Sequence, residues 1–174
     1  MDAYKKACRE LEKEIIDQCY IGYSAAVLAL KRNWGWGKKR ITNLLGKSQE
    51  IWMECAGDVN KSMIQMLDEE TGIEIQNGDG KSWKDLAYLN SKINTDRMTK
   101  AMYIYMRREQ KKWTAPQVMA CLLLALHRRE GFGYDRCQRF VAQVDEIKGQ
   151  YKDTVTIRKA ALEETRINIT ETVK

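Results

Sequence analysis

The chain has 174 residues, of which 44% are apolar and 31% are charged, and its formal net charge is +6. This length suits one domain or two small ones with a real hydrophobic core. The longest apolar run, Val118–Leu126, is too short to span a bilayer, which excludes a membrane-spanning protein.

The cysteine and histidine content predicts neither a disulfide framework nor a metal centre. The cysteines are odd in number, widely spaced and mostly on apolar helical positions, and they are Cys8, Cys19, Cys55, Cys121 and Cys137. With one histidine, His127, and no CxxC pair, they indicate reduced, buried thiols and neither zinc nor another cofactor. The charged, helix-forming N-terminus has no signal-peptide pattern, so we expect a cytoplasmic protein without a membrane association.

The single proline and the abundance of Lys, Glu, Leu and Ala predict helices, beginning with one over residues 2–20 that Asp2 caps. Gly22 is expected to end this helix, and Ser24 to begin a short second one. Because residues 25–30 are apolar on every side, the second helix should be central and buried. Gly35-Trp36-Gly37 should end it, and a third helix should follow from Lys38 to about Cys55.

An acidic insert, residues 57–96, follows these helices. It should contain an amphipathic helix from Val59 to Leu67 and a turn-rich stretch, Thr71–Gly80. A further helix should open at Ser82, with Asp85 in the position of a capping box.

The second half of the chain repeats the order of the first. A helix should present one face from Met98 to Met106, and Thr114 should cap the next helix, whose first turn contains Pro116. Gly131-Phe132-Gly133 then separates the buried Val118–Leu126 segment from a closing helix over 135–151. A helix at about 154–165 should lead to a fraying tail.

Residues 24–51 align without a gap to residues 120–147, at a constant offset of 96, and nine of these 28 pairs are identical. We therefore expect an all-α fold built from a duplicated three-helix unit, with the two copies packed about a pseudo-twofold axis. The divisions are 1–56, 57–96, 97–152 and 153–174, most simply within one compact domain. Arg40 and Arg136 recur together with Glu50 and Glu146, and the plainest explanation is that these charges pair across or within the repeats.

The turn between the glycines has a chemistry of its own. Glycine ends a helix in the left-handed conformation at no Cβ penalty, and the next helix begins with unpaired N–H groups that can bind an anion. The first copy then places Lys38, Lys39 and Arg40 in the first helical turn. There the helix dipole disfavours each cation by about 0.3–1 kcal/mol. Because the second copy has Asp135 instead, the first copy is the expected phosphate-binding turn and the second its structural counterpart.

The segment Asn33-Trp34-Gly35-Trp36-Gly37-Lys38-Lys39-Arg40 resembles the helix-hairpin-helix DNA-binding motif, in which a Gly-hydrophobic-Gly turn offers backbone amides to phosphates. The resemblance covers about 15–20 residues per copy, and Trp34 and Glu130 stand where that family usually has proline. It implies nucleic-acid binding by Lys31, Arg32, Trp34, Gly35, Gly37, Lys38, Lys39, Arg40 and Lys47. A secondary turn would comprise Arg128, Arg129, Gly131, Gly133 and Arg136.

Two roles stay open for Trp34. Its counterpart is Glu130, so the fold does not require an aromatic residue at this position, and Trp34 either stacks on a base or packs in the core or an interface.

The L-A-L-x-R…G-aromatic-G-x-x-R pattern also resembles small helical proteins of phages and prophages of Gram-positive bacteria. We expect a non-enzymatic accessory or regulatory protein that binds nucleic acid, DNA foremost, with weak sequence specificity, because no nucleophile–base pair stands out.

The alternative is a phage-encoded module that inhibits or adapts a host protein, as part of an anti-defence role for example. It would use the acidic insert, since residues 50–79 carry eight acids against Lys61, or an aromatic surface. The expected location is the cytoplasm of a bacterial host cell, and the sequence leaves a homodimer open.

Overall fold

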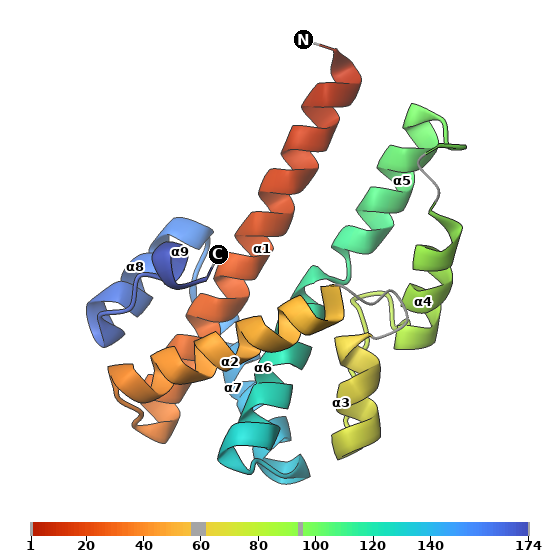
Figure 1. The fold of residues 1–174 in the computed structure, drawn as a ribbon. Helices are drawn as coiled ribbons and strands as arrows, with labels where there is room; N and C mark the ends of the chain where they lie inside the picture. The colour runs from red at the N-terminus through yellow and green to blue at the C-terminus, as the bar shows by residue number, and fades with distance from the viewer. Residues whose placement is uncertain (1, 57–61, 94–95, 174) are drawn as a thin grey trace.

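The computed structural model describes residues 2–56, 62–93 and 96–173, and all regular secondary structure within these ranges is helical, as expected (Figure 1). The helices are α1 (Ala3–Trp34), α2 (Lys38–Ala56), α3 (Met63–Thr71), α4 (Trp83–Lys92), α5 (Lys100–Lys111), α6 (Thr114–Glu130), α7 (Tyr134–Gln150), α8 (Thr154–Thr165) and α9 (Ile169–Thr172). None of them is long and apolar enough to cross a membrane.

Two buried segments form the centre of the core. Every residue of Gly22–Leu30 in α1 and of Val118–Leu126 in α6 is buried. Helix α1 packs on α7, α2 packs on α6, and α1 and α6 also contact each other. The expectation of two buried central helical segments is confirmed.

The expected helix break at Gly22 is wrong, because α1 continues through this residue to Trp34. A Cβ atom at Gly22 would lie 2.9 Å from Cγ1 of Val118, so the glycine permits close approach of α1 and α6. Packing of this kind outweighs the helix propensity of glycine, which is only about 1 kcal/mol worse than that of alanine. The first unit therefore consists of two helices and not of three.

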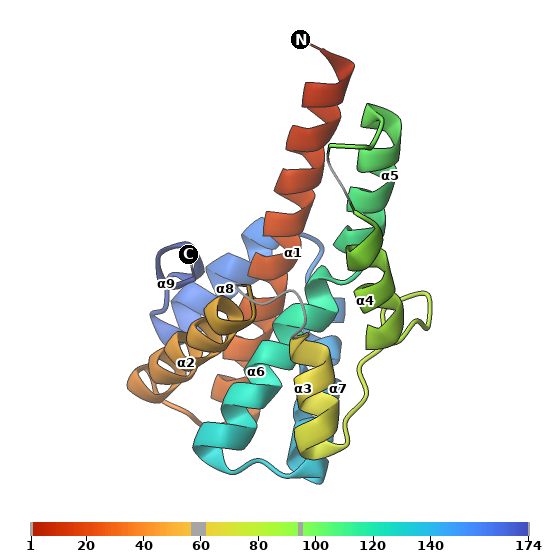
Figure 2. The ribbon, with the colours of Figure 1, turned by 45° about the vertical axis from the view of Figure 1, so that its right-hand side comes forward.

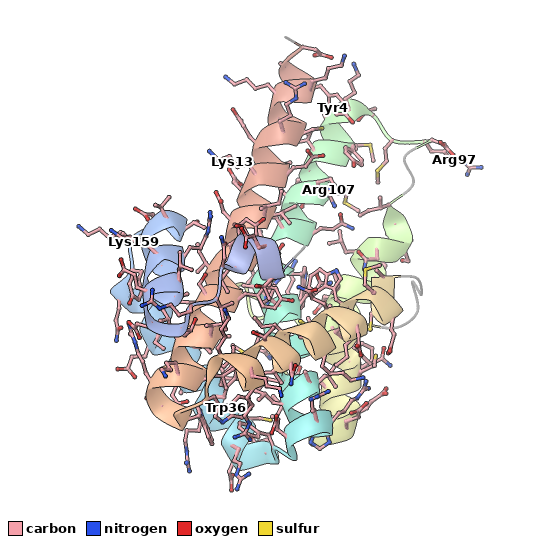
Figure 3. All side chains as sticks on the ribbon, turned by 60° about the vertical axis from the view of Figure 1, so that its left-hand side comes forward. Tyr4, Lys13, Trp36, Arg97, Arg107 and Lys159 are labelled. Atoms are coloured by element: carbon pink, nitrogen blue, oxygen red, sulfur yellow. The ribbon has the colours of Figure 1, made fainter. Side chains whose placement is uncertain are left out.

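The N-terminal half of α1 extends past the core with α5 beside it (Figure 2). The helix begins as predicted, because Oδ1 of the capping residue Asp2 accepts a hydrogen bond from the backbone N–H of Tyr4 at 3.2 Å. Tyr4 also contacts Tyr103 of α5, with ring centroids 6.3 Å apart. This arm lies at the opposite end of the molecule from Trp36, as the labelled side chains in Figure 3 show.

The described part of the insert contains helices α3 and α4, joined by a non-helical stretch over residues 72–82 where the sequence predicts turns. The N-terminal part of its first expected helix, around Val59, lies outside the described residues, and α3 begins at Met63. At α4, the carboxylate of Asp85 accepts from the backbone N–H of Ser82 at 2.9 Å, as the capping-box pattern predicts. Thr114 is the first residue of α6 and not its cap.

The C-terminal tail does not fray. Ile167 and Ile169 are buried, and α9 contacts α1 and α2. The side-chain amide of Gln49 in α2 donates to the backbone carbonyl of Thr172 at 2.6 Å. The tail is ordered because its alternating isoleucines cover apolar surface that α1 and α2 leave open.

Candidate functional site

The two Gly-aromatic-Gly turns have the same backbone conformation. Gly35 has φ 66° and ψ 23°, and Gly131 has φ 67° and ψ 28°, so both are left-handed. The aromatic residue that follows, Trp36 or Phe132, is buried with 4% or 2% of its surface exposed. Its amide donates back to the preceding helix, to the carbonyl of Leu30 at 3.1 Å or of Leu126 at 3.2 Å. The glycines are needed for the positive φ, and the aromatics anchor the turns to the core.

The two turns lie side by side although 96 residues separate them in sequence. The ring of Phe132 in the second turn lies 4.8 Å from that of Trp34 and 6.1 Å from that of Trp36 in the first. The indole N–H of Trp34 also donates to the side-chain oxygen of Gln143 in α7 at 2.7 Å. The candidate residues of both copies therefore belong to one end of the molecule.

The helices that leave the turns present unpaired backbone N–H groups. The first helical backbone hydrogen bond of α2 is donated by the N–H of Ile41 to the carbonyl of Gly37 at 3.1 Å. The amides of residues 38–40 consequently lack an acceptor within the helix. Helix α7 begins in the same way, with the N–H of Cys137 bonded to the carbonyl of Gly133 at 3.1 Å. Gly37 and Gly133 are exposed, and a Cβ at either would meet no atom within 4 Å, so the backbone there is open to a ligand.

Three of the predicted lysines are accessible for an external anion. Lys31, Lys38 and Lys39 are exposed, and no carboxylate of the described residues lies within ion-pair distance of them. The first turn of α2 also contains no acidic residue. These lysines can therefore reach a phosphate without first breaking an internal ion pair.

Arg40 and Lys47 are engaged within the protein. The guanidinium of Arg40 stacks on the ring of Trp36, 3.8 Å from its centroid, and its Nη2 lies 2.7 Å from Oε2 of Glu130. Lys47 pairs with Glu50 at 3.2 Å. The expected pairing of Arg40 and Arg136 with Glu50 and Glu146 is wrong, because no ion pair joins these residues in the described part of the chain. Glu50 lies nearly three turns along α2 from Arg40, next to Lys47. Arg40 reaches instead to the other copy.

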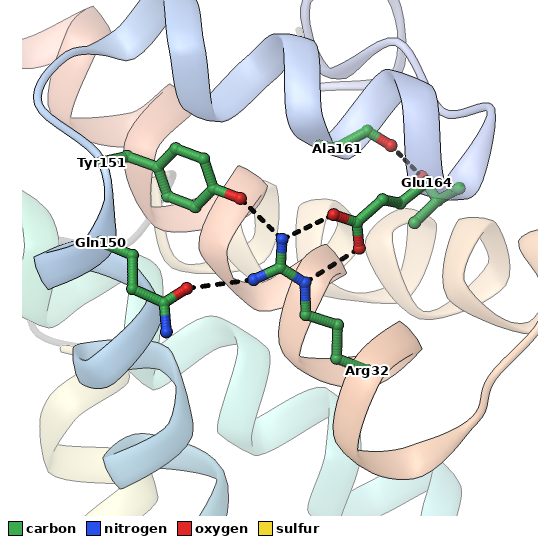
Figure 4. Close-up of polar contacts among 6 residues, drawn as sticks. Arg32, Gln150, Tyr151, Ala161 and Glu164 are labelled. Atoms are coloured by element: carbon green, nitrogen blue, oxygen red, sulfur yellow. Dashed lines mark hydrogen bonds and ion pairs between the residues drawn. The ribbon is translucent and has the colours of Figure 1, made fainter.

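Arg32 is the centre of a polar network between α1 and the C-terminal region (Figure 4). Its Nε and Nη2 donate to the carboxylate of Glu164 at 2.9 and 2.6 Å, and further bonds run to Gln150 at 3.1 Å and to the hydroxyl of Tyr151 at 2.6 Å. The bond to Glu164 raises the pKa of Arg32 and lowers that of Glu164. With all three of its nitrogens bonded, Arg32 holds α8 against α1, and its charge is largely neutralised.

Of the basic residues of the second turn, some are held in ion pairs and others are not, as in the first turn. Arg128 forms a two-pronged ion pair with Glu70 of α3, which lowers the pKa of that carboxyl group. Both arginines are exposed, but no carboxylate of the described residues lies within ion-pair distance of Arg129. Arg136 lies over the ring of Phe132 at 5.8 Å, the same relation as between Arg40 and Trp36 but looser.

One histidine bond has no counterpart in the first turn. Nδ1 of His127 lies 2.8 Å from the carbonyl oxygen of Phe132. A carbonyl oxygen can only accept, so Nδ1 carries the proton and donates. At the equivalent position the first copy has Lys31.

Trp34 is partly buried and not freely presented to solvent. Its ring lies against Phe132, and the guanidinium of Arg139 lies 6.0 Å from its centroid on α7. These contacts favour packing between the turns over stacking on a base. Sequence reasoning missed both Arg139 and Gln143, because the equivalent residues of the first copy, Asn43 and Lys47, carry no matching pattern.

The described residues contain no cluster of three or more metal-ligating side chains. The expected burial of the cysteines is confirmed for Cys121 and Cys137, whereas Cys8, Cys19 and Cys55 are only partly buried. Burial raises the pKa of Cys121 to about 12 and that of Cys137 to about 11, so both are protonated and poor nucleophiles.

Comparison with protein-family models, curated proteins and solved structures gave no match for this chain.

Proposed function

We propose that this protein binds nucleic acid through the end formed by its two Gly-aromatic-Gly turns, as a non-enzymatic accessory or regulatory protein of the phage type. One observation carries the proposal. At the start of α2, exposed Lys38 and Lys39 lie beside backbone amides that have no acceptor within the helix. Such a site combines two groups that bind phosphate oxygens, N–H donors and mobile cations.

The electrostatics of α2 support this function. Cations in the first helical turn oppose the helix dipole, so they reduce the stability of the free protein by about 0.3–1 kcal/mol each where they are exposed. A bound phosphate would reverse the sign of that effect. The two turn regions, residues 31–40 and 127–139, together hold nine Lys or Arg against two acidic residues. A large share of the net positive charge is thus gathered at one end.

We infer that the two turn regions are copies of one ancestral helix–turn–helix unit related by a pseudo-twofold axis. Gly22 and Val118, where α1 and α6 approach closely, stand 96 residues apart and are equivalent in the repeat. The packing is reciprocal as well, since α1 contacts α7 of the other copy and α2 contacts α6. A twofold arrangement of this kind explains why both turns come to the same end.

The arrangement favours contacts with the phosphate backbone over the reading of base edges. Its exposed groups include lysines, arginines and main-chain amides. Trp34, Trp36 and Phe132 are buried or partly buried, although Tyr134 at the start of α7 is 53% exposed. Binding should therefore depend strongly on salt and weakly on sequence.

The test is fluorescence-polarisation binding to labelled double-stranded DNA, single-stranded DNA and RNA at about 50 and 200 mM salt. We expect the wild type to bind, and Lys38→Glu/Lys39→Glu to lose most of the affinity. The matched control is Lys5→Glu/Lys6→Glu, which changes the net charge equally at the far end of α1. Affinity that is insensitive to salt, or an equal loss in both double variants, would refute a specific role of the first turn.

A second candidate, a protein-interaction module, is favoured by one feature of the arm. Helix α5 has no buried residue, and its Met102 and Tyr105 are 52% and 61% exposed. Methionine and tyrosine are typical of protein interfaces. Co-purification of one host protein that Tyr105→Lys abolishes, together with the absence of nucleic-acid binding, would favour this function.

A further inference from the structure

The carboxylate of Glu130 occupies an anion position at the first turn. Arg40 is the third residue of α2, and stacking on Trp36 holds its guanidinium at the turn, 3.8 Å from the ring centroid. Oε2 of Glu130 lies 2.7 Å from Nη2 of this guanidinium, and the side chain of Glu130 is only 16% exposed. The cation that lies nearest the turn aromatic is therefore already paired.

This pairing exists at one turn only. The counterpart of Glu130 in the first copy is Trp34, which has no carboxylate to offer to Arg136. No carboxylate of the described residues lies within ion-pair distance of Arg136, although it lies over Phe132 as Arg40 lies over Trp36. The ion pair is thus a property of the particular residue at position 130 and not of the repeated turn.

The position of Glu130 is unfavourable for α6 itself. It is the last residue of that helix, where the helix dipole disfavours an acid, and the other charged residues of the final turn are basic. A residue selected only for the stability of α6 would not be acidic there. Its partner lies across the interface, on a helix whose first turn also opposes its own dipole.

We propose that Glu130 is a built-in competitor of the phosphate, which holds Arg40 in the free protein and lowers the affinity of the first turn. This inference rests on the proposed nucleic-acid binding. A phosphate that approaches the amides of α2 must displace the carboxylate to reach Arg40. Glu130 therefore sets the threshold for binding, and its removal makes one more cation available to the ligand.

The experiment compares Glu130→Gln with Glu10→Gln by fluorescence polarisation on an about 20-base-pair DNA duplex between about 50 and 200 mM salt. Both changes remove one acid and release one ion pair, since Glu10 pairs with Lys6 at the far end of α1. We expect Glu130→Gln to bind about three- to tenfold tighter at the lower salt. The slope of log K against log salt should steepen by about 0.9, the value for one additional phosphate contact. Glu10→Gln should change neither quantity beyond the general effect of charge.

A double variant identifies the cation. In an Arg40→Gln background, Glu130→Gln should give no gain, because the residue that it releases is gone. A gain that persists there, or a gain no larger than that of Glu10→Gln, overturns the proposal. If Glu130→Gln lowers the melting temperature below the assay range, Glu130→Asp replaces it, since the shorter side chain loses reach while the net charge is unchanged.

The outcomes separate this inference from the proposed function. Salt-dependent binding by the wild type that requires Lys38 and Lys39, without a gain in Glu130→Gln, refutes the competitor and leaves the function intact. Binding that appears only in Glu130→Gln supports both. The absence of binding in both proteins at about 50 mM salt refutes both.

Discussion

The two turns share a backbone and differ in what their side chains contact. Both have a left-handed glycine, a buried aromatic residue and an arginine above that ring. In the first turn Arg40 is held by Glu130, and in the second His127 donates to the carbonyl of Phe132. The residues that the two turns share thus specify the shape of the turn, whereas the residues that differ decide which charges are paired.

The largest expected effects concern the two aromatic anchors. Trp36→Ala and Phe132→Ala should each lower the free energy of unfolding by about 3–5 kcal/mol, because both rings are buried and their removal leaves a cavity. Phe132→Ala should be the more severe, since Phe132 contacts both Trp34 and Trp36. Urea unfolding measures this, and a loss below about 1 kcal/mol for either variant would contradict the anchoring role.

Charge reversal in each turn should separate their contributions to binding. Lys38→Glu/Lys39→Glu should weaken binding to DNA by about ten- to hundredfold at about 50 mM salt. Arg129→Glu/Arg136→Glu, which changes the net charge equally, should weaken it less, because Asp135 already opposes the charge of the second turn. Polarisation titrations measure the loss of affinity in each double variant. Equal losses would contradict this prediction and would mean that the ligand contacts both turns alike.

Within each turn, substitution of the first glycine should reduce stability more than substitution of the second. Gly35→Ala and Gly131→Ala should each destabilise the protein by about 1–2 kcal/mol, because a residue with a Cβ is strained at positive φ. Gly37→Ala and Gly133→Ala are the matched controls and should change stability by less than about 0.5 kcal/mol, since space is open around both. Thermal unfolding would reveal a failure of this contrast as equal shifts within a pair.

The smallest expected effects concern the ion pairs that connect the repeat arginines to other helices. Glu164→Gln and Glu70→Gln should each reduce stability by at most about 1 kcal/mol at neutral pH, because these side chains are about a third exposed.

These pairs also give a direction in pH. The pKa of both carboxyl groups lies below its ordinary value of 4.5, so each pair stabilises the fold fully above that pH. The contribution disappears as the pH falls towards the lowered pKa. Unfolding curves of wild type and variants should therefore converge in acid, and a difference that grew in acid would contradict the assignment.

Local patterns along the chain correctly predicted the helical class and the left-handed form of both turns. The two apolar runs predicted which segments are buried, since residues 25–30 and Val118–Leu126 are the interior parts of α1 and α6. The Gly-aromatic-Gly pattern predicted left-handed glycines at Gly35 and Gly131, because no other residue adopts that conformation without strain. These features depend on neighbours along the chain, and local patterns therefore carry the information.

Which residues contact each other depends on tertiary packing, which local patterns do not specify. Gly22 was expected to end a helix, yet it lies inside α1. Glycine is required there because α6 approaches too closely to leave room for a side chain. The sequence predicted the same phosphate-binding role for Arg32 and Arg40, yet Arg32 forms an ion pair with Glu164 and Arg40 forms one with Glu130. The partners stand 132 and 90 residues away, and no local pattern specifies a contact of that range. The matching residues give the two turns the same backbone, but packing of the helices against one another decides which charges are paired.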